Sequence, residues 1–291
     1  APAPSSVSRT LRRWAAGAAV ALLALLVLAT GAIYARTTLM LRRTYDIPAD
    51  RVAVPTDSAS IAEGERIARI RGCEACHGDG LAGAMMHDPG PVGAVLIGRM
   101  SGPNLTQLVP RYTDAELVGL LRWGVRPDGR SLVVMPSSIL HDLTDDDLGR
   151  LIAWLRTLPR QERQVRSTSY GLLARGALAL GAFPLEAAAI DRNDRPPATR
   201  PEDPMALGRY LARTSCSECH GSALEGNPQA PGLAIAAGYT DDQFRHFLRT
   251  GEALGGRELQ EMSETARQRF THLTDAEIAA LHTYLRSLGG S

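Results

Sequence analysis

The feature that most constrains this chain is a six-residue pattern that occurs twice. The four cysteines of the two copies are the only cysteines in the sequence, and the copies are Cys73-Glu74-Ala75-Cys76-His77-Gly78 and Cys216-Ser217-Glu218-Cys219-His220-Gly221. Two thiols three positions apart can each form a thioether with one vinyl group of a haem, while the histidine that follows reaches the iron. The pattern therefore predicts two covalently attached c-type haems, held by Cys73, Cys76, Cys216 and Cys219.

Two other uses of paired cysteines compete with this interpretation. A zinc ribbon also has two C-x-x-C pairs, but its second pair follows after about 15 to 20 residues, whereas most of a domain separates Cys76 from Cys216. A thioredoxin-like dithiol needs no histidine directly after its second cysteine. The histidine and glycine that follow both pairs favour haem attachment.

The length and charge of the chain set broad limits. A length of 291 residues is typical of about two domains, and a formal net charge of +1 gives no reason to expect a nucleic-acid partner.

The first 35 residues differ in kind from the rest. Arg9, Arg12 and Arg13 precede an uncharged apolar run at 14–35, which as a helix is long enough to cross a bilayer and has an aromatic residue at each end, Trp14 and Tyr34. We expect a cytoplasmic N-terminus at 1–13, a transmembrane helix at 14–35 and a tether at 36–60. A cleaved signal peptide is the alternative, but its apolar region is usually only about 7 to 15 residues long.

The haem motifs orient this helix. The basic residues on its two sides are balanced, so charge alone does not decide. Thioethers to c-type haem are made outside the cytoplasm, which predicts a single-pass protein of the bacterial inner membrane with its haem domains in the periplasm.

An internal repeat divides the remaining chain into two predicted domains, 61–160 and 201–291, joined by a segment at 161–200. Each begins with a helical run that contains a glycine, Gly64 or Gly208, and each ends with a helix that starts Leu-Thr-Asp, at 143–158 and at 273–288. We expect Thr144 and Thr274 to cap these helices. We also expect Trp154 and Tyr284 to lie opposite the two glycines, where the helices of each copy cross closely.

The repeat also indicates the second iron ligand. Between 112 and 135 the first copy aligns without a gap with 239–262, and Met135 then coincides with Met262. A methionine thioether opposes histidine on the iron of electron-transfer haem proteins. We therefore assign His77 and Met135 to the first iron, and His220 and Met262 to the second. Ser263 stands where Pro136 follows Met135.

Several other residues could take part in haem binding. Arg130 and Arg257 also align in the repeat, and either could hold a haem propionate or be a solvated surface residue. Other residues compete for the iron, namely Met85, Met86, His87, Met100, His141, His246, His272 and His282. Met85, Met86 and His87 lie within ten residues of His77 and are expected on the same side of the haem, whereas Met100, His246, His272 and His282 have no counterpart of the same type in the other copy, and surface or core roles are favoured for the histidines of the second copy.

The chain resembles membrane-anchored dihaem cytochromes c, and 61–291 is similar to two class I cytochrome c domains in tandem. The resemblance rests on the two Cys-His motifs, Pro103-Asn104-Leu105-Thr106, Gly129-Arg130 ahead of Met135-Pro136, and the Leu-Thr-Asp helices. It implies an all-α fold of two small haem-binding helical domains after the transmembrane helix. It also implies redox partner proteins, namely a quinol-oxidising complex, a terminal oxidase or a periplasmic dehydrogenase.

Ligation from both sides of each iron would leave no position for a substrate, so the sequence predicts an electron-transfer protein or subunit rather than an enzyme. The alternative is a dihaem enzyme of the peroxidase or thiosulfate dehydrogenase type, in which one iron can open. In the segment between the domains, an apolar stretch at 170–183 is expected to pack across the domain interface.

Overall fold

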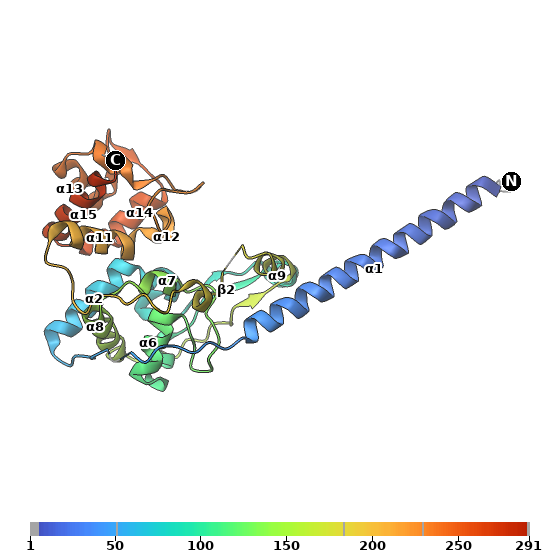
Figure 1. Ribbon diagram of the computed structural model, residues 1–291, viewed down its shortest axis with the longest axis horizontal. Coiled ribbons are helices and arrows are strands. Elements are labelled where there is room, and N and C mark those ends of the chain that lie inside the picture. The colour runs from blue at the N-terminus through green and yellow to red at the C-terminus, as the bar shows by residue number, and fades with distance from the viewer. Residues whose placement is uncertain (1–5, 51, 183, 229, 290–291) are drawn as a thin grey trace. The chain divides into compact units, whose positions relative to one another are not determined.

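The computed structural model is mostly helical (Figure 1) and describes residues 6–50, 52–182, 184–228 and 230–289. Residues 1–5 of the predicted cytoplasmic segment, Phe183 of the apolar stretch and the last two residues of the second predicted domain lie outside this description. The chain packs as two compact units. The smaller comprises residues up to 43, 88–99 and 168–183, and the larger comprises 44–87, 100–167 and 184–291.

The smaller unit is built around one long apolar helix, α1 (Ser6–Arg42). Its part from Leu11 to Arg42 has a mean hydropathy of 2.4 in its most apolar window and no buried residue there, so it is long and apolar enough to cross a membrane. The unit also contains α4 (Gly90–Leu96), β3 (Ser169–Tyr170) and α9 (Leu172–Ala179).

Helix α9 packs against α1 within this unit. The guanidinium of Arg175 lies 4.5 Å from the centre of the Tyr34 ring, and its Nη1 donates to Thr37 Oγ1 at 2.8 Å. The expectation that this apolar stretch packs across the domain interface is therefore wrong, because α9 belongs to the same compact unit as α1 and packs against that helix.

The larger unit contains both copies of the repeat. Elements of the first copy are α2 (Ser58–Arg71), α3 (Cys73–His77), η1 (Asp79–Leu81), β1 (Ala84–His87), α5 (Leu105–Leu108), η2 (Val109–Arg111), α6 (Asp114–Trp123), α7 (Ser137–Leu140) and α8 (Asp145–Arg156). A short connecting helix, α10 (Glu186–Ala189), follows. Elements of the second copy are α11 (Pro204–Ser215), α12 (Ser217–His220), η3 (Leu233–Gly238), α13 (Asp241–Thr250), β4 (Glu252–Ala253), β5 (Arg257–Glu258), α14 (Glu261–Gln268), η4 (Phe270–His272) and α15 (Asp275–Ser287).

Side-chain caps fix where the main helices begin. Thr144 accepts a hydrogen bond from Asp147 N at the start of α8, and Thr274 forms a reciprocal capping box with Glu277 at the start of α15. Both caps were predicted from the Leu-Thr-Asp pattern. They satisfy backbone donors that have no partner inside the helix.

The first and last helices of each copy cross at the predicted glycines. A Cβ atom on Gly64 of α2 would lie 2.0 Å from the carbonyl oxygen of Arg150 and 3.0 Å from Trp154 Cβ in α8. A Cβ atom on Gly208 of α11 would lie 2.1 Å from Ala280 O and 2.7 Å from Tyr284 Cβ in α15. Only glycine allows this approach, so the predicted crossing is confirmed in both copies.

Short strands were not predicted. Strand β1 pairs antiparallel with residues 100–102 of β2 (Gly98–Gly102) in the larger unit, while residues 98–99 of β2 pair with β3 in the smaller one. Strands β1 and β2 lie in an insertion in the first copy that has no equivalent in the second, and β3 lies in the segment that follows the first copy. The repeat therefore gave no information about them.

Most buried apolar residues of the larger unit form one continuous core, which includes residues of both copies such as Ile67, Leu148, Leu211 and Leu281. A second, smaller cluster contains Trp123, Val125, Ala187 and Ile190.

Candidate functional site: the two Cys-His segments

Each Cys-His pattern lies on a short helix that follows the first helix of its copy, α3 after α2 and α12 after α11. All four cysteines are free thiols. Burial raises the pKa of Cys73 and of Cys216 to about 11, whereas a redox-active dithiol needs a lowered thiol pKa. Among the described residues, no group of metal-ligating side chains gathers around either cysteine pair. The dithiol and zinc interpretations therefore have no support.

The two histidines are held in the same way. His77 Nδ1 lies 2.9 Å from the carbonyl oxygen of Pro103, and His220 Nδ1 lies 2.7 Å from that of Pro231. Because a carbonyl can only accept, Nδ1 carries the hydrogen and Nε2 keeps its lone pair. Both rings are buried, and burial lowers the pKa of His77. Each ring is thus oriented for its Nε2 to bind a metal.

The backbone around the two histidines repeats bond for bond. Gly83 N donates to His77 O at 2.6 Å, and Gly226 N donates to His220 O at 2.9 Å. Two residues before these glycines, Leu81 and Leu224 have φ values of 55° and 60°, in the left-handed region that few leucines adopt. A strained conformation that recurs at equivalent positions indicates one shared function for the two segments.

The residues present fit a covalently bound haem. Two free thiols and a neutral imidazole on or next to one short helix are the donor set that haem c requires, and a close approach of the backbone supports α3. A Cβ atom on Gly102 would lie 1.9 Å from Cys76 O, so glycine is needed where the chain passes this helix.

The predicted methionine ligands lie in different local structures. Met135 precedes α7 in an irregular segment, whereas Met262 lies in the first turn of α14; both are half-buried and pack against the core. Ser263, which replaces the proline of the first copy, is fully buried. Its Oγ accepts from Leu259 N at 2.8 Å and donates to Gly251 O. This hydroxyl ties the Met262 segment to the end of α13.

The other predicted contacts have mixed placements. Arg130 is exposed, and its Nε donates to Asp128 Oδ2 at 2.9 Å, while the exposed Arg257 donates to Leu254 O at 3.0 Å. Their propionate roles stay predictions. Both ring nitrogens of His282 have partners, Asp241 Oδ1 at 2.7 Å and Ala236 O at 3.1 Å, so His282 is not placed to bind iron.

Two arginines bring the Cys-His segments together. Arg269 Nε donates to the carbonyl of Ile70 at 2.9 Å, and its Nη1 lies 3.6 Å from Glu218 Oε2, between the cysteines of the second segment. Arg71 donates to Ser215 Oγ, next to Cys216. The two attachment segments are therefore neighbours, with positive charge between them.

A larger charged cluster joins the two copies. Arg66 of α2 donates to both oxygens of Glu277 in α15, at 2.7 and 2.8 Å. Asp147 of α8 is fully buried and accepts from Tyr210 Oη of α11 at 2.6 Å and from Arg200 Nε. Each carboxylate thus has partners from the other copy or from the connecting segment, which fixes the position of one copy against the other.

Sequence reasoning missed Pro231 and Arg269, and it named Ser263 without the hydrogen bonds of its hydroxyl. Pro231 could have been found from Pro231-Gly232-Leu233, which parallels Pro103-Asn104-Leu105. Arg269 has no local signal, because its partners are distant in sequence.

Comparisons with known proteins agree with this geometry. The cytochrome c family model matches residues 205–289, so this part of the chain is a cytochrome c domain, which implies covalently bound haem c. The fructose dehydrogenase cytochrome subunit of Gluconobacter japonicus is 26% identical over 274 residues, which are 83% of this chain and 55% of the relative.

Two further relatives are similar to the same extent. The cytochrome c subunit of alcohol dehydrogenase (quinone) from Gluconacetobacter polyoxogenes is 26% identical over 270 residues, 80% of this chain and 56% of its own length. The gluconate 2-dehydrogenase cytochrome c subunit of Pantoea cypripedii is 26% identical over 278 residues, which are 80% of this chain and 60% of the relative. The chain spans little more than half the length of these relatives. Each of these relatives is the cytochrome subunit of a dehydrogenase.

Proposed function

We propose that this chain is a membrane-anchored dihaem c-type cytochrome that carries single electrons as a subunit of a dehydrogenase complex. The observation that carries the proposal is the bond-for-bond match between the two Cys-His segments. The second segment lies inside the cytochrome c domain, and the first repeats its histidine–proline bond, its glycine–histidine bond and its left-handed leucine. The residues proposed to hold haem in the second copy therefore have counterparts in the first.

The chain's own residues would perform distinct tasks at each site. Bound haem would supply one-electron chemistry at its iron. Cys73, Cys76, Cys216 and Cys219 would hold it, and His77 and His220 would bind iron through Nε2, oriented by Pro103 and Pro231. Met135 and Met262 would complete the ligation, leaving no open position for a reactant.

Juxtaposition of the two attachment segments supports transfer from one site to the other. Arg269 and Arg71 each contact the neighbourhood of both cysteine pairs. The charged cluster around Glu277 and Asp147 holds the copies in one arrangement, so the spacing between the sites is fixed rather than left to a mobile linker.

The names of the relatives suggest where the electrons come from. Each relative is a cytochrome subunit of a dehydrogenase, and α1 would place this chain at a membrane. We propose a periplasmic or membrane-bound dehydrogenase as the donor and a membrane quinone or terminal oxidase as the acceptor, with the larger unit in the periplasm.

Haem counting tests the proposal. The purified chain is expected to contain two covalent haems, measured as iron per polypeptide and by the absorption of the pyridine complex. Replacing Cys73 and Cys76 by alanine should leave one haem, and replacing Cys216 and Cys219 should leave the other. A single haem in the unmodified chain would contradict the dihaem assignment. Co-purification with a dehydrogenase subunit after gentle solubilisation tests the complex.

A further inference from the structure

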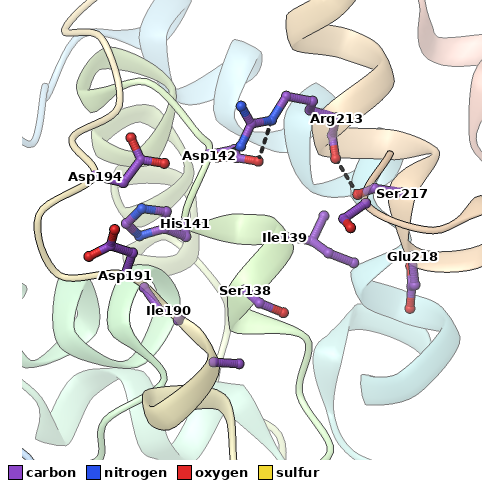
Figure 2. A pocket seen from close by; sticks show the side chains of 12 residues that line it. Ser138, Ile139, His141, Asp142, Ile190, Asp191, Asp194, Arg213, Ser217 and Glu218 are labelled. Carbon is purple, nitrogen blue, oxygen red and sulfur yellow. Dashed lines mark hydrogen bonds and ion pairs between the residues drawn. The ribbon is translucent and has the colours of Figure 1, made fainter. Parts of the chain in front are cut away.

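A pocket of about 470 Å³ lies in the larger unit beside the second Cys-His segment, from which Ser217 and Glu218 contribute to its lining. Its lining includes His141 and Asp142 directly after α7, Asp191 and Asp194 from the connecting segment, and Arg213 of α11. Figure 2 shows the His141 ring beside Asp191 and Asp194, with Arg213 bonded to Asp142. None of these residues has a task in the proposed electron transfer.

His141 has the arrangement of a metal ligand. Its side chain belongs to a residue only 4% exposed, and its ring meets Trp123 edge-on with 4.9 Å between centres. Its Nδ1 lies 3.3 Å from the carbonyl oxygen of Arg122, while its Nε2 is buried without a hydrogen-bond partner. A carbonyl behind Nδ1 and a free Nε2 is also the arrangement of His77 and His220, and it is how proteins orient a metal-binding imidazole.

Two carboxylates lie close to this imidazole. One ligand atom each from His141, Asp142 and Asp194 lie within 4.8 Å of one another. Tetrahedral zinc, with bonds of about 2.0–2.2 Å, needs its ligand atoms roughly 3.4 Å apart. Asp194 is exposed on an irregular segment, so its side chain can move to close the remaining distance.

The charges around the pocket favour a cation. Asp191 and Glu218 add two carboxylates to its lining, and Glu218 also pairs with Arg269 Nη1 at 3.6 Å. The positive charge of Arg213 is engaged by Asp142, to which it donates from Nε at 3.0 Å and from Nη2 at 2.9 Å. Arg122 is directed away, toward Asp145 and the carbonyl of Leu143. A bound cation would give the buried Nε2 of His141 the partner that it lacks among the described residues.

We propose that His141, Asp142 and Asp194 bind a divalent transition-metal ion of the zinc class, with water completing the coordination. One nitrogen and two oxygens suit zinc better than magnesium or calcium, which prefer all-oxygen sites. The ion would link the first copy, through His141 and Asp142, to the connecting segment, through Asp194. Arg213 of the second copy also contacts the ligand Asp142, so the bound ion would brace the junction of both copies.

Zinc binding to the full-length, haem-loaded protein tests this proposal. After dialysis against zinc and removal of the excess, about one zinc per chain is expected beyond haem iron, measured by elemental analysis. Zinc should also raise the Tm in a concentration-dependent manner, because it binds the folded state. His141→Gln and Asp194→Asn should each lose the bound zinc and the Tm shift, while the haem spectrum stays that of the unmodified protein.

His246→Gln is the matched control, since His246 is exposed and pairs only with Glu252 at 3.6 Å; it should keep the zinc. If replacement of the buried His141 disturbs folding, Asp194→Asn still tests the site, because Asp194 is exposed. Zinc retained by both site variants, or no zinc above the level of a chelator-treated sample in the unmodified protein, would overturn the proposal. A changed haem spectrum in His141→Gln with zinc binding intact would instead assign His141 to the haem and would equally overturn it.

Discussion

At the scale of single residues, Ser263 takes the place that Pro136 has in the first copy, and it restrains the backbone by side-chain hydrogen bonds instead of by a proline ring. Pro136 restricts the backbone after Met135, whereas the buried Ser263 hydroxyl holds the Met262 segment through Leu259 N and Gly251 O. Two different chemical means thus restrain the two predicted methionine ligands.

Ser263→Ala should therefore loosen Met262. The variant leaves Gly251 O and Leu259 N without this partner, which should lower the free energy of unfolding by about 1–3 kcal/mol. Half of the methionine-to-ferric-iron charge-transfer absorption should weaken, and one reduction potential should fall. Thr283→Ala is the control, because that exposed hydroxyl donates to Ala279 O within its own helix at 2.9 Å. An unchanged charge-transfer band in Ser263→Ala would show that the hydroxyl does not position Met262.

Arg269 contacts the neighbourhood of both proposed haem sites. It contacts Ile70 before the first cysteine pair and Glu218 within the second. Arg269→Gln removes a positive charge that disfavours the oxidised, more positive iron, so both potentials should fall, by on the order of 50 mV. Potentiometric titration measures this. Arg267→Gln, which removes an exposed partner of Glu258, should leave both potentials nearly unchanged; equal shifts in the two variants would contradict a specific role.

At the scale of elements, the helix crossings in both copies depend on one glycine each. Gly64→Ala and Gly208→Ala would place a methyl group about 2 Å from a carbonyl oxygen, so the helices must separate. We expect each to lower the free energy of unfolding by about 1–3 kcal/mol. Denaturant unfolding checks this, with Gly176→Ala as control, because nothing lies within 4 Å of a Cβ atom there and α9 has helical backbone. That control should be neutral or slightly stabilising.

The elements that could be predicted from sequence are those with local signals. Thr144, Thr274 and the two glycines act through residues close in sequence or repeated in the second copy, and their roles are confirmed. The strands at 84–102 could not be predicted, because they lie in an insertion without a counterpart. Pro103 lies 26 residues after His77, whereas Pro231 lies only 11 residues after His220. The same histidine–carbonyl hydrogen bond therefore closes two loops of different length.

At the scale of the whole larger unit, the arrangement of the two copies depends on buried charges that no local pattern reveals. Arg66 and Glu277 are 211 positions apart in the sequence, yet they form a bidentate ion pair. Glu277 also accepts from Thr274 N at the start of α15, so one carboxylate both caps a helix and joins the copies. Such long-range pairs become visible only in the folded chain.

This junction should weaken in acid. Burial acts to raise the pKa of Glu277, but hydrogen bonds from Arg66 and Thr274 outweigh it and lower the pKa. A depressed folded pKa gives stability that is present above the unfolded value of about 4.3 and is lost as pH falls through the folded pKa. The free energy of unfolding, compared at pH 7 and near pH 4, should therefore drop less in Glu277→Gln than in the unmodified protein. Glu162→Gln, at an exposed position, should keep the full drop.

The smaller unit has a practical consequence for anyone who wishes to obtain the haem-bearing part in water. Three separate segments of the chain make up this unit, and they contain α1, α4 and α9. A fragment that starts at residue 44 would still carry these two helices, with Val92, Val95, Leu173 and Leu180 already exposed and α9 deprived of the helix it packs on. This fragment should aggregate in buffer without detergent. A fragment in which 88–99 and 168–183 are also replaced by short polar turns should remain soluble.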